Sequence, residues 1–431
     1  ARVPAFDKAR QGLDEEFVRC NTVISARRAA AQQDSYRPMR TTMTAALAAI
    51  TAAVAIALRR RRRRKEEQDD WTACGGAQLV GSTPLIKLQS LSKLCGCDVY
   101  AKCEHLNPNG TGKDRLALAM ILNAEADGSL PKGGGGYVVE GSSGSTTLAL
   151  APLVAAAGHK LVAVIPDDCA AEKRDAIRAC PGVDVHVVQS AAISSPTHYV
   201  NVARKLAKDL NEKGKTAIFA DQFDNLCNWR THLHTAHEIR NQVGRVDAFV
   251  MGAGTGGTLA GCSKVFDEAR IYLADPQGSA LHSKVRHGVC YNVKQAERSV
   301  RRHRYDTIAD GIGLDRVTAN FREARVDDAI RVADQDALVM AHYLLRFEGL
   351  FLGSSSALNC VAALRAGAEL RRSSSDRLTV VTVLCDGGAR YLSRFWNREF
   401  VEKRGLSWPP EDSGALAGLV ERLVKREEVV L

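Results

Sequence analysis

The stretch Asn107-Pro-Asn-Gly-Thr-Gly-Lys-Asp-Arg115 places one lysine, Lys113, at the end of a loop of turn-forming residues. A strand-like run at residues 98–103 precedes this loop, and a helix-like run at residues 116–122 follows it. A lysine at such a junction can be held rigidly and partly withdrawn from water. Desolvation and neighbouring cations lower the pKa of an ammonium group, and only the neutral amine forms a Schiff base. Lys113 is therefore a candidate catalytic residue, although most lysines are solvated surface charges.

Two glycine-rich loops repeat this order of strand, loop and helix. One is Glu-Gly-Ser-Ser-Gly-Ser-Thr-Thr at residues 140–147, and the other is Met-Gly-Ala-Gly-Thr-Gly-Gly-Thr at residues 251–258. Such loops turn several backbone N–H groups toward one point, where the helix dipole also favours an anion. The second loop suits a phosphate and the first a substrate carboxylate. One such loop alone is usually only a tight turn, but the lysine and both loops together indicate a binding site.

Strand-like and helix-like segments alternate from residue 71 onward. The predicted strands lie at residues 137–139, 161–165, 183–188, 217–219, 247–251, 271–274 and 379–384. Helix-like segments between them include residues 146–157, 169–180 and 259–269. This alternation predicts an α/β fold with two doubly wound parallel-sheet domains, whose ligands bind at the carboxyl ends of the strands.

The ordered motifs resemble those of the cysteine synthase and cystathionine β-synthase family, which are fold-type II enzymes dependent on pyridoxal phosphate (PLP). The resemblance runs over residues 71–402 and is closest to the membrane-anchored, cysteine synthase-like proteins of mitochondria. The matching stretches are residues 81–85, 107–115, 141–147, 222–225, 254–258, 310–313, 353–356 and 385–393. The resemblance implies one catalytic-type domain with a smaller movable subdomain at about residues 109–215.

The resemblance also implies a role for individual residues. Lys113 would bind PLP covalently and then remove the Cα proton of the substrate, while the cofactor accepts electrons. The cofactor would further contact Ser145 through its 3′-oxygen, Ser354 through its ring nitrogen, and a phosphate loop formed by Gly254, Thr255, Gly256, Gly257 and Thr258. The substrate would contact Ser142, Ser143, Gly144, Thr146, Gln222 and Gly311. No metal is implied.

Three residues depart from the family pattern. Ser145 stands where the family usually has Asn, and this shorter side chain would hold the cofactor ring less firmly. Thr147 replaces a usual Gly and is expected to tighten the substrate loop. Asp386 replaces a small neutral residue, and its charge matters only if its side chain points inward.

Residues 1–70 form an N-terminal extension. Residues 41–58 are an uncharged, alanine-rich run that would span roughly 27 Å as a helix, just short of a hydrocarbon core. Seven Arg and Lys residues follow at 59–65, as is typical of a flank that is not translocated. We predict a transmembrane helix at 41–58, and the alternative is a solvent-exposed helix. The resemblance places this anchor in the mitochondrial inner membrane with a matrix-facing domain, or otherwise in the outer membrane.

Composition narrows the choice of partners. Lys and Arg total 59 and Asp and Glu total 49, a net charge of +10, and the run at 59–65 accounts for much of it. The near-neutral remainder argues against nucleic acid as a partner. The twelve cysteines lack paired zinc spacing and are predicted to be mostly free, buried thiols. His232, His234 and His237 are interpreted as a solvated helix face rather than a metal site.

Two functions fit the sequence. The first is β-replacement, in which O-acetylserine loses acetate, sulfide adds and cysteine forms. The alternative is an enzyme-derived accessory subunit of a mitochondrial inner-membrane complex with weak or no catalysis, since a fold does not guarantee activity. The expected partners are an amino-acid substrate, the membrane, a second copy in a homodimer and other subunits of such a complex. Residues 403–431 are predicted to form a helical tail.

Overall fold

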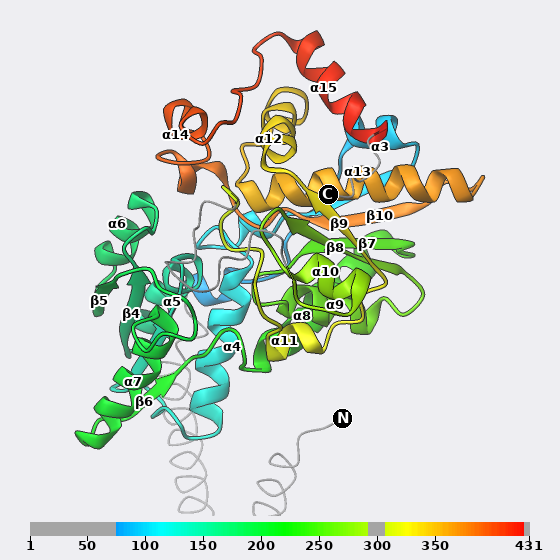
Figure 1. Ribbon diagram of the computed structural model, residues 1–431. Coiled ribbons are helices and arrows are strands. Elements are labelled where there is room, and N and C mark those ends of the chain that lie inside the picture. Colours follow the sequence, from blue (N-terminus) through cyan, green and yellow to red (C-terminus); the bar gives the residue numbers. More distant parts are fainter. Residues whose placement is uncertain (1–74, 292–306, 426–431) are drawn as a thin grey trace, which may run out of the picture. The chain divides into compact units, whose positions relative to one another are not determined.

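The computed structural model describes residues 75–291 and 307–425, and these contain two sheets with helices on both faces (Figure 1). The larger sheet has six strands in the order β1-β2-β10-β7-β8-β9. All neighbours in it are parallel except β1 and β2, which are antiparallel. Its strands are β1 (Leu85–Lys87), β2 (Asp98–Lys102), β7 (Ala248–Gly252), β8 (Arg270–Pro276), β9 (Asp328–Val332) and β10 (Thr379–Val383).

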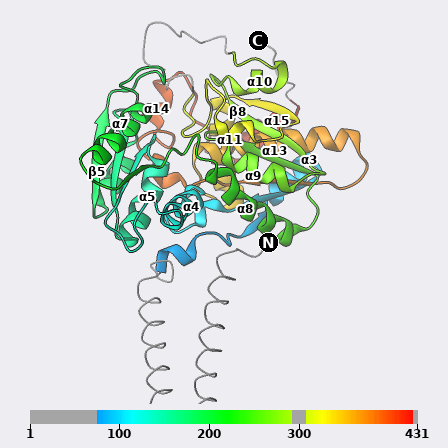
Figure 2. The same ribbon diagram turned by 90° about the horizontal axis from the view of Figure 1, so that it is seen from below.

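The smaller sheet has four parallel strands in the order β5-β4-β3-β6. They are β3 (Tyr137–Gly141), β4 (Lys160–Pro166), β5 (Val183–Val188) and β6 (Ala217–Phe219). One face packs on α4 (Lys113–Ala126), α5 (Ser145–Ala156) and α6 (Ala171–Ala179), and the other on α7 (Tyr199–Glu212). Figure 2 shows this group of elements beside the larger sheet.

Helices from distant parts of the chain cover the larger sheet. On one face lie α3 (Gln89–Cys95), α12 (Asp334–Glu348), α13 (Ser354–Ser373) and α15 (Ser413–Lys425). The other face carries α8 (Cys227–Val243), α9 (Gly257–Val265) and α10 (Leu281–His287). The remaining short helices are η2 (Gly75–Leu79), η3 (Glu104–Leu106), α11 (Ala319–Arg322), η5 (Gly388–Tyr391) and α14 (Arg398–Glu402).

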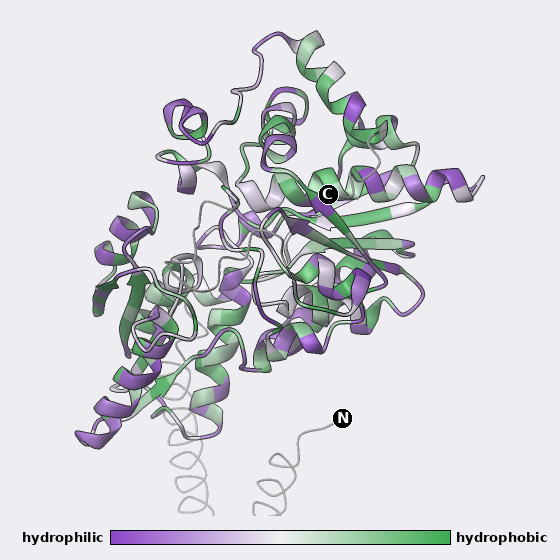
Figure 3. Ribbon diagram, in the orientation of Figure 1, coloured by the Kyte–Doolittle hydropathy of each residue, from purple (hydrophilic) through white to green (hydrophobic). Residues whose placement is uncertain are grey.

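The strand pattern follows from burial on both faces. Strand β4 contains the continuous apolar run Leu-Val-Ala-Val-Ile, and β7 reads Ala-Phe-Val-Met-Gly, as expected when helices cover both sides of a parallel sheet. Figure 3 shows hydrophobic colours along the strands and hydrophilic colours on outer helices such as α6 and α7.

The α/β fold with two doubly wound parallel sheets is confirmed. Each strand predicted at 137–139, 161–165, 183–188, 217–219, 247–251, 271–274 and 379–384 coincides with a strand or overlaps one. The sequence reasoning did not identify β1 or β9. The smaller sheet ends at Phe219, so the range 109–215 leaves out β6. The tail contains α15, whose Leu416, Val420 and Leu423 join the core of the larger sheet.

The predicted membrane anchor lies outside this part of the chain. Residues 1–70, with the span at 41–58 and the basic flank at 59–65, precede the first described residue. In the ranges 75–291 and 307–425, no helix combines the length and apolar character needed to cross a bilayer.

Candidate active site

Backbone hydrogen bonds fix the loop that carries Lys113. Gly110 N–H donates to the Asn107 carbonyl at 2.7 Å and closes a turn. Asn109 N–H donates to the Asp114 carboxylate at 2.6 Å. Thr111 pairs with Asp386 in a single antiparallel bridge, which ties the loop to the chain just after β10. Lys113 is therefore the first residue of α4 and lies at the carboxyl edge of the larger sheet.

Arg115, in the first turn of α4, belongs to a buried cluster of charged side chains. Arg115 donates to both carboxylate oxygens of Glu104 at 2.8 Å and also to Glu238 at 2.7 and 2.8 Å. Burial disfavours the ionised form of both carboxyls, but Arg115 outweighs it and holds the Glu104 pKa below 4.5 and the Glu238 pKa at about 2. Lys102 completes the cluster, at 2.7 Å from Glu238.

Lys113 lines two adjoining pockets. The inner pocket is enclosed by Thr111, Lys113, Ser145, Met251, Gly252, Gly254, Thr255, Gly256, Thr258, Asp310, Gly311, Ile312, Ser355, Cys385 and Asp386. The outer pocket shares Lys113, Ser145, Gly254, Thr255 and residues 310–312 with it, and adds Ser142, Ser143, Thr146, His198, Tyr199 and Gln222, among others. The predicted lysine thus stands between the two predicted anion-binding loops.

The inner pocket has the features that a PLP phosphate requires. Its floor is the start of α9, where the helix-capping position is Gly256, with a φ of 86°. A Cβ atom at Gly256 would lie 2.6 Å from Phe321, and one at Gly254 would lie 2.0 Å from the Gly311 carbonyl oxygen. Bare backbone N–H groups at a helix start favour an anion. The residues present therefore fit the phosphate, with Lys113 across the same pocket.

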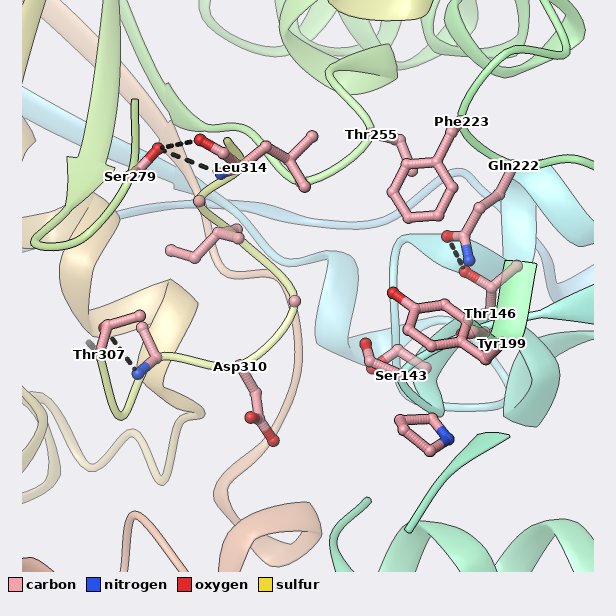
Figure 4. Close-up of a pocket in the computed structure, with 18 of the residues that line it drawn as sticks. Ser143, Thr146, Tyr199, Gln222, Phe223, Thr255, Ser279, Thr307, Asp310 and Leu314 are labelled. Atoms are coloured by element: carbon pink, nitrogen blue, oxygen red, sulfur yellow. Dashed lines mark hydrogen bonds between the residues drawn. The ribbon is translucent and has the colours of Figure 1, made fainter. Parts of the chain in front are cut away.

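The outer pocket brings the predicted substrate residues together. Figure 4 shows Ser143, Thr146 and Gln222 on one side and Asp310 with Thr307 on the other. Thr146 Oγ1 donates to Gln222 Oε1 at 2.5 Å. Ser142, Ser143, Thr146, Gln222 and Gly311 all line this pocket. Gly144 does not line it, and a Cβ atom at Gly144 would face Cys169 and the α6 residue Lys173.

Two of the predicted cofactor residues do not line the inner pocket. A Cβ at Gly257 would collide with the Asn228 side chain at 1.9 Å, so Gly257 packs on α8. Ser354 is fully buried, and its hydroxyl accepts a hydrogen bond from the Asp310 N–H at 3.1 Å. The next residue, Ser355, lines the pocket instead.

The structure locates the three departures from the family pattern. Ser145 lines both pockets. Thr147 is buried, and its hydroxyl donates to the Gly144 carbonyl at 3.0 Å, so it joins the first turn of α5 to the substrate loop. Asp386 points inward: it is 4% exposed, lines the inner pocket, and accepts a hydrogen bond from the Tyr391 hydroxyl at 2.5 Å.

The histidine prediction was wrong for one of its three residues. His234 and His237 are exposed, but His232 is 2% exposed and its ring nitrogen lies 3.2 Å from Thr258 Oγ1. Burial lowers the pKa of His232 to about 3, so this ring stays neutral. In residues 75–291 and 307–425, no three His, Cys, Asp or Glu side chains are grouped to hold a metal ion. The described cysteines are free, and most are buried.

Sequence reasoning missed several residues that line the pockets. His198 and Tyr199 reach the outer pocket from the start of α7, and Asp310 lies between the two pockets. Asp310 lies within a matched family motif, residues 310–313, but no sequence pattern marked the other two.

Known proteins with similar sequences identify the family of this chain. The model of the pyridoxal-phosphate dependent enzyme family matches residues 77–386. A putative mitochondrial cysteine synthase of Saccharomyces cerevisiae is 43% identical over 75% of this chain and 84% of its own length. Cysteine synthase 2 of Neurospora crassa is 45% identical over 76% of this chain and 74% of its own length.

Solved structures agree with these relatives. The O-acetylserine dependent cystathionine β-synthase of Helicobacter pylori superposes with a TM-score of 0.62 at 26% identity, covering 74% of this chain and 96% of that one. An O-ureido-L-serine synthase superposes with a TM-score of 0.61 at 30% identity, covering 74% of this chain and 93% of that one. The chain therefore belongs to the pyridoxal-phosphate dependent enzyme family and, within it, to the cysteine synthase and cystathionine β-synthase group.

Proposed function

We propose that the protein is a PLP-dependent β-replacement enzyme that converts O-acetylserine and sulfide into cysteine and acetate. One observation carries the proposal: Lys113 opens onto both pockets, between a phosphate cradle on one side and a substrate loop on the other. The similarity to relatives named cysteine synthase supports this choice of substrates.

The residues of the inner pocket would hold the cofactor. Lys113 would attach it covalently, and the backbone of residues 254–258 with the Thr258 hydroxyl would bind its phosphate. Ser145 contacts the 3′-oxygen through its shorter side chain. Among the consecutive serines at the start of α13, we assign the ring nitrogen to Ser355, because Ser355 lines the pocket whereas the Ser354 hydroxyl bonds to Asp310 N–H.

The outer pocket would bind and orient the amino acid. The hydroxyls of Ser142 and Ser143 and the backbone N–H of Thr146 would face the α-carboxylate, with Gln222 beside them and Gly311 opposite. Gly144 would shape the loop without lining the pocket, since its N–H donates to Ser142 Oγ. When bound, the cofactor withdraws electrons from the substrate Cα. The substrate amine would replace Lys113 Nζ on the cofactor, which would free Nζ to accept the Cα proton. The Cβ–O bond to acetate would then break, hydrosulfide would form the new Cβ–S bond, and Lys113 would return the proton to Cα. Closure of the segment at about 109–215 would exclude water from this exchange.

The experiment is visible absorption spectroscopy of the purified protein before and after O-acetylserine is added, followed by a cysteine assay with sulfide. The wild type is expected to show a cofactor band that O-acetylserine shifts, and Lys113→Ala is expected to lose both the band and the product. A wild-type band that O-acetylserine leaves unchanged would refute the proposed substrate. An enzyme-derived accessory subunit would then be the leading alternative.

We further propose that the protein is mitochondrial and attached to a membrane through residues 41–58, with the inner membrane and a matrix-facing domain as the favoured arrangement. The uncharged run and the basic flank at 59–65 support the anchor, and the yeast relative named mitochondrial supports the compartment. A homodimer is the expected assembly, with other membrane subunits as further partners. A variant lacking residues 1–70 should leave the membrane fraction, and its retention there would exclude the anchor.

A further inference from the structure

Glu140 is a buried acid directly behind the substrate loop. It is the fourth residue of β3, is 1% exposed, and immediately precedes residues 141–147. Its Oε1 accepts a hydrogen bond from Gln222 Nε2 at 2.9 Å. Its Oε2 has no hydrogen-bond partner among residues 75–291 and 307–425, and no ion pair in these ranges includes it.

Gln222 connects Glu140 to the substrate loop through hydrogen bonds. Its Nε2 faces Glu140 and the Gly141 carbonyl, so its Oε1 faces Thr146, whose hydroxyl donates to it at 2.5 Å. The Gln222 backbone is held by Asn228 Nδ2, which donates to its carbonyl at 2.8 Å. The amide therefore has one orientation that satisfies all of its neighbours.

We propose that Glu140 is a positioning residue, a buried and uncharged carboxylic acid that orients Gln222 and, through the hydrogen bond from the Thr146 hydroxyl to Gln222 Oε1, holds the loop that binds the substrate carboxylate. The proposal rests on the assignment of residues 142–146 and Gln222 to that carboxylate. An ionised Glu140 would place an unsolvated negative charge behind a loop that must bind an anion. Both the desolvation of this charge and its repulsion of the substrate disfavour it.

The surrounding charges favour the uncharged form. Burial and the charge of Asp221 raise the pKa of Glu140 to about 8, and they outweigh the interactions with Gln222 and with the Asp221 backbone, which lower it. Asp221 in turn faces Asp224, Arg204 from α7 at 3.8 Å, and Arg316. These two arginines act on Asp221 and leave Glu140 without a cation of its own.

The test compares Glu140→Gln and Glu140→Ala with the wild-type holoenzyme. A glutamine side chain copies the protonated acid, since it keeps one acceptor for Gln222 and replaces the O–H by N–H. We expect wild-type KM for O-acetylserine to rise above about pH 8 with a smaller change in kcat. The KM of Glu140→Gln for O-acetylserine should equal that of the wild type at pH 7, and it should not rise above about pH 8. Glu140→Ala should raise KM about tenfold, the equivalent of one lost hydrogen bond.

A second measurement separates this proposal from the proposed function. Calorimetric titration of each holoenzyme with L-serine in the absence of sulfide reports amino-acid binding without cysteine formation, and Glu125→Gln, a buried acid paired with His159 at 3.1 Å, is the control. Wild type that binds L-serine but forms no cysteine would refute the reaction and leave Glu140 testable. Glu140→Gln that binds as weakly as Glu140→Ala at pH 7, or that keeps the alkaline rise, would overturn the role of Glu140. Wild type that fails to bind L-serine would overturn the loop assignment and the proposal with it.

Discussion

Replacing Arg115 by methionine should cost several kcal/mol of folding stability, and the cost should depend on pH. Arg115 supplies the only cation that bonds directly to Glu104 in the described residues, because the nearby Lys102 bonds to Glu238 and to the Thr83 carbonyl. Glu104 is 1% exposed. Removing the guanidinium therefore leaves a buried carboxylate without a partner of opposite charge.

The size of the effect follows from protonation of Glu104. Without Arg115, burial raises the pKa of this carboxyl, so the folded variant must bind a proton at pH 7 that the unfolded chain, with its usual pKa of 4.5, does not hold. At about 1.36 kcal/mol per pH unit, this costs about 3.4 kcal/mol. Breaking a buried ion pair typically costs about 3–5 kcal/mol, out of a total stability of about 5–15 kcal/mol.

Urea unfolding at pH 7 and pH 5 measures the cost. In the wild type the Glu104 pKa is depressed, so its contribution is present above 4.5 and is lost only as pH falls through the lower folded value. In Arg115→Met the Glu104 pKa is raised, so the penalty grows as pH rises above 4.5. The stability deficit should thus be about 2.7 kcal/mol smaller at pH 5 than at pH 7.

The exposed ion pair of Arg398 and Glu402 provides a matched control. Arg398→Met removes an exposed pair with Glu402 and should change stability at neither pH. If the Arg115→Met deficit were below about 1 kcal/mol, or equal at the two pH values, the reasoning about an unpaired Glu104 would be wrong.

Three further predictions concern the loops around the pockets. Lys173→Met removes a buried ammonium 3.3 Å from Asp310 and 4.2 Å from the Tyr391 ring, and should raise KM for O-acetylserine and lower stability by about 1–3 kcal/mol in urea unfolding. Gly256→Ala adds a Cβ 2.6 Å from Phe321 at a φ of 86°, and should lower the cofactor content read from visible absorbance. Thr147→Val loses the hydrogen bond to Gly144, and should cost about 1 kcal/mol of thermal stability with a higher KM.

The fold could be predicted from sequence because central parallel strands are long apolar runs. Strand β1 has only three residues, and β9 is an edge strand with charged Asp328 and Arg331, so neither gives that signal. The exposed histidines could also have been separated from the buried one. His232 shares a helical face with Ala236 and Ile239, which are both buried, whereas His234 and His237 point elsewhere.

The position of Ser355 could not be predicted, because residues 354–356 are three serines in a row. Which serine faces the pocket depends on where α13 begins and on the hydrogen bond that the Asp310 N–H donates to the Ser354 hydroxyl. Tertiary contacts set both of these features. The pairing of Glu140 with Gln222 was hidden for the same reason, since 82 residues separate them in sequence.

Three residues next to the pockets bear on whether the protein catalyses or only supports a complex. Glu140 Oε2 and Asp386 Oδ1 are both buried without a hydrogen-bond partner in the described residues, and Asp221, beside Gln222, has a φ of 51°. Each feature costs stability, and a purely structural subunit gains nothing from it. All three lie beside the pockets that Lys113 lines. A binding site accounts for these three costs because such costs are retained where binding and chemistry need them, and they therefore favour the β-replacement enzyme over the accessory subunit.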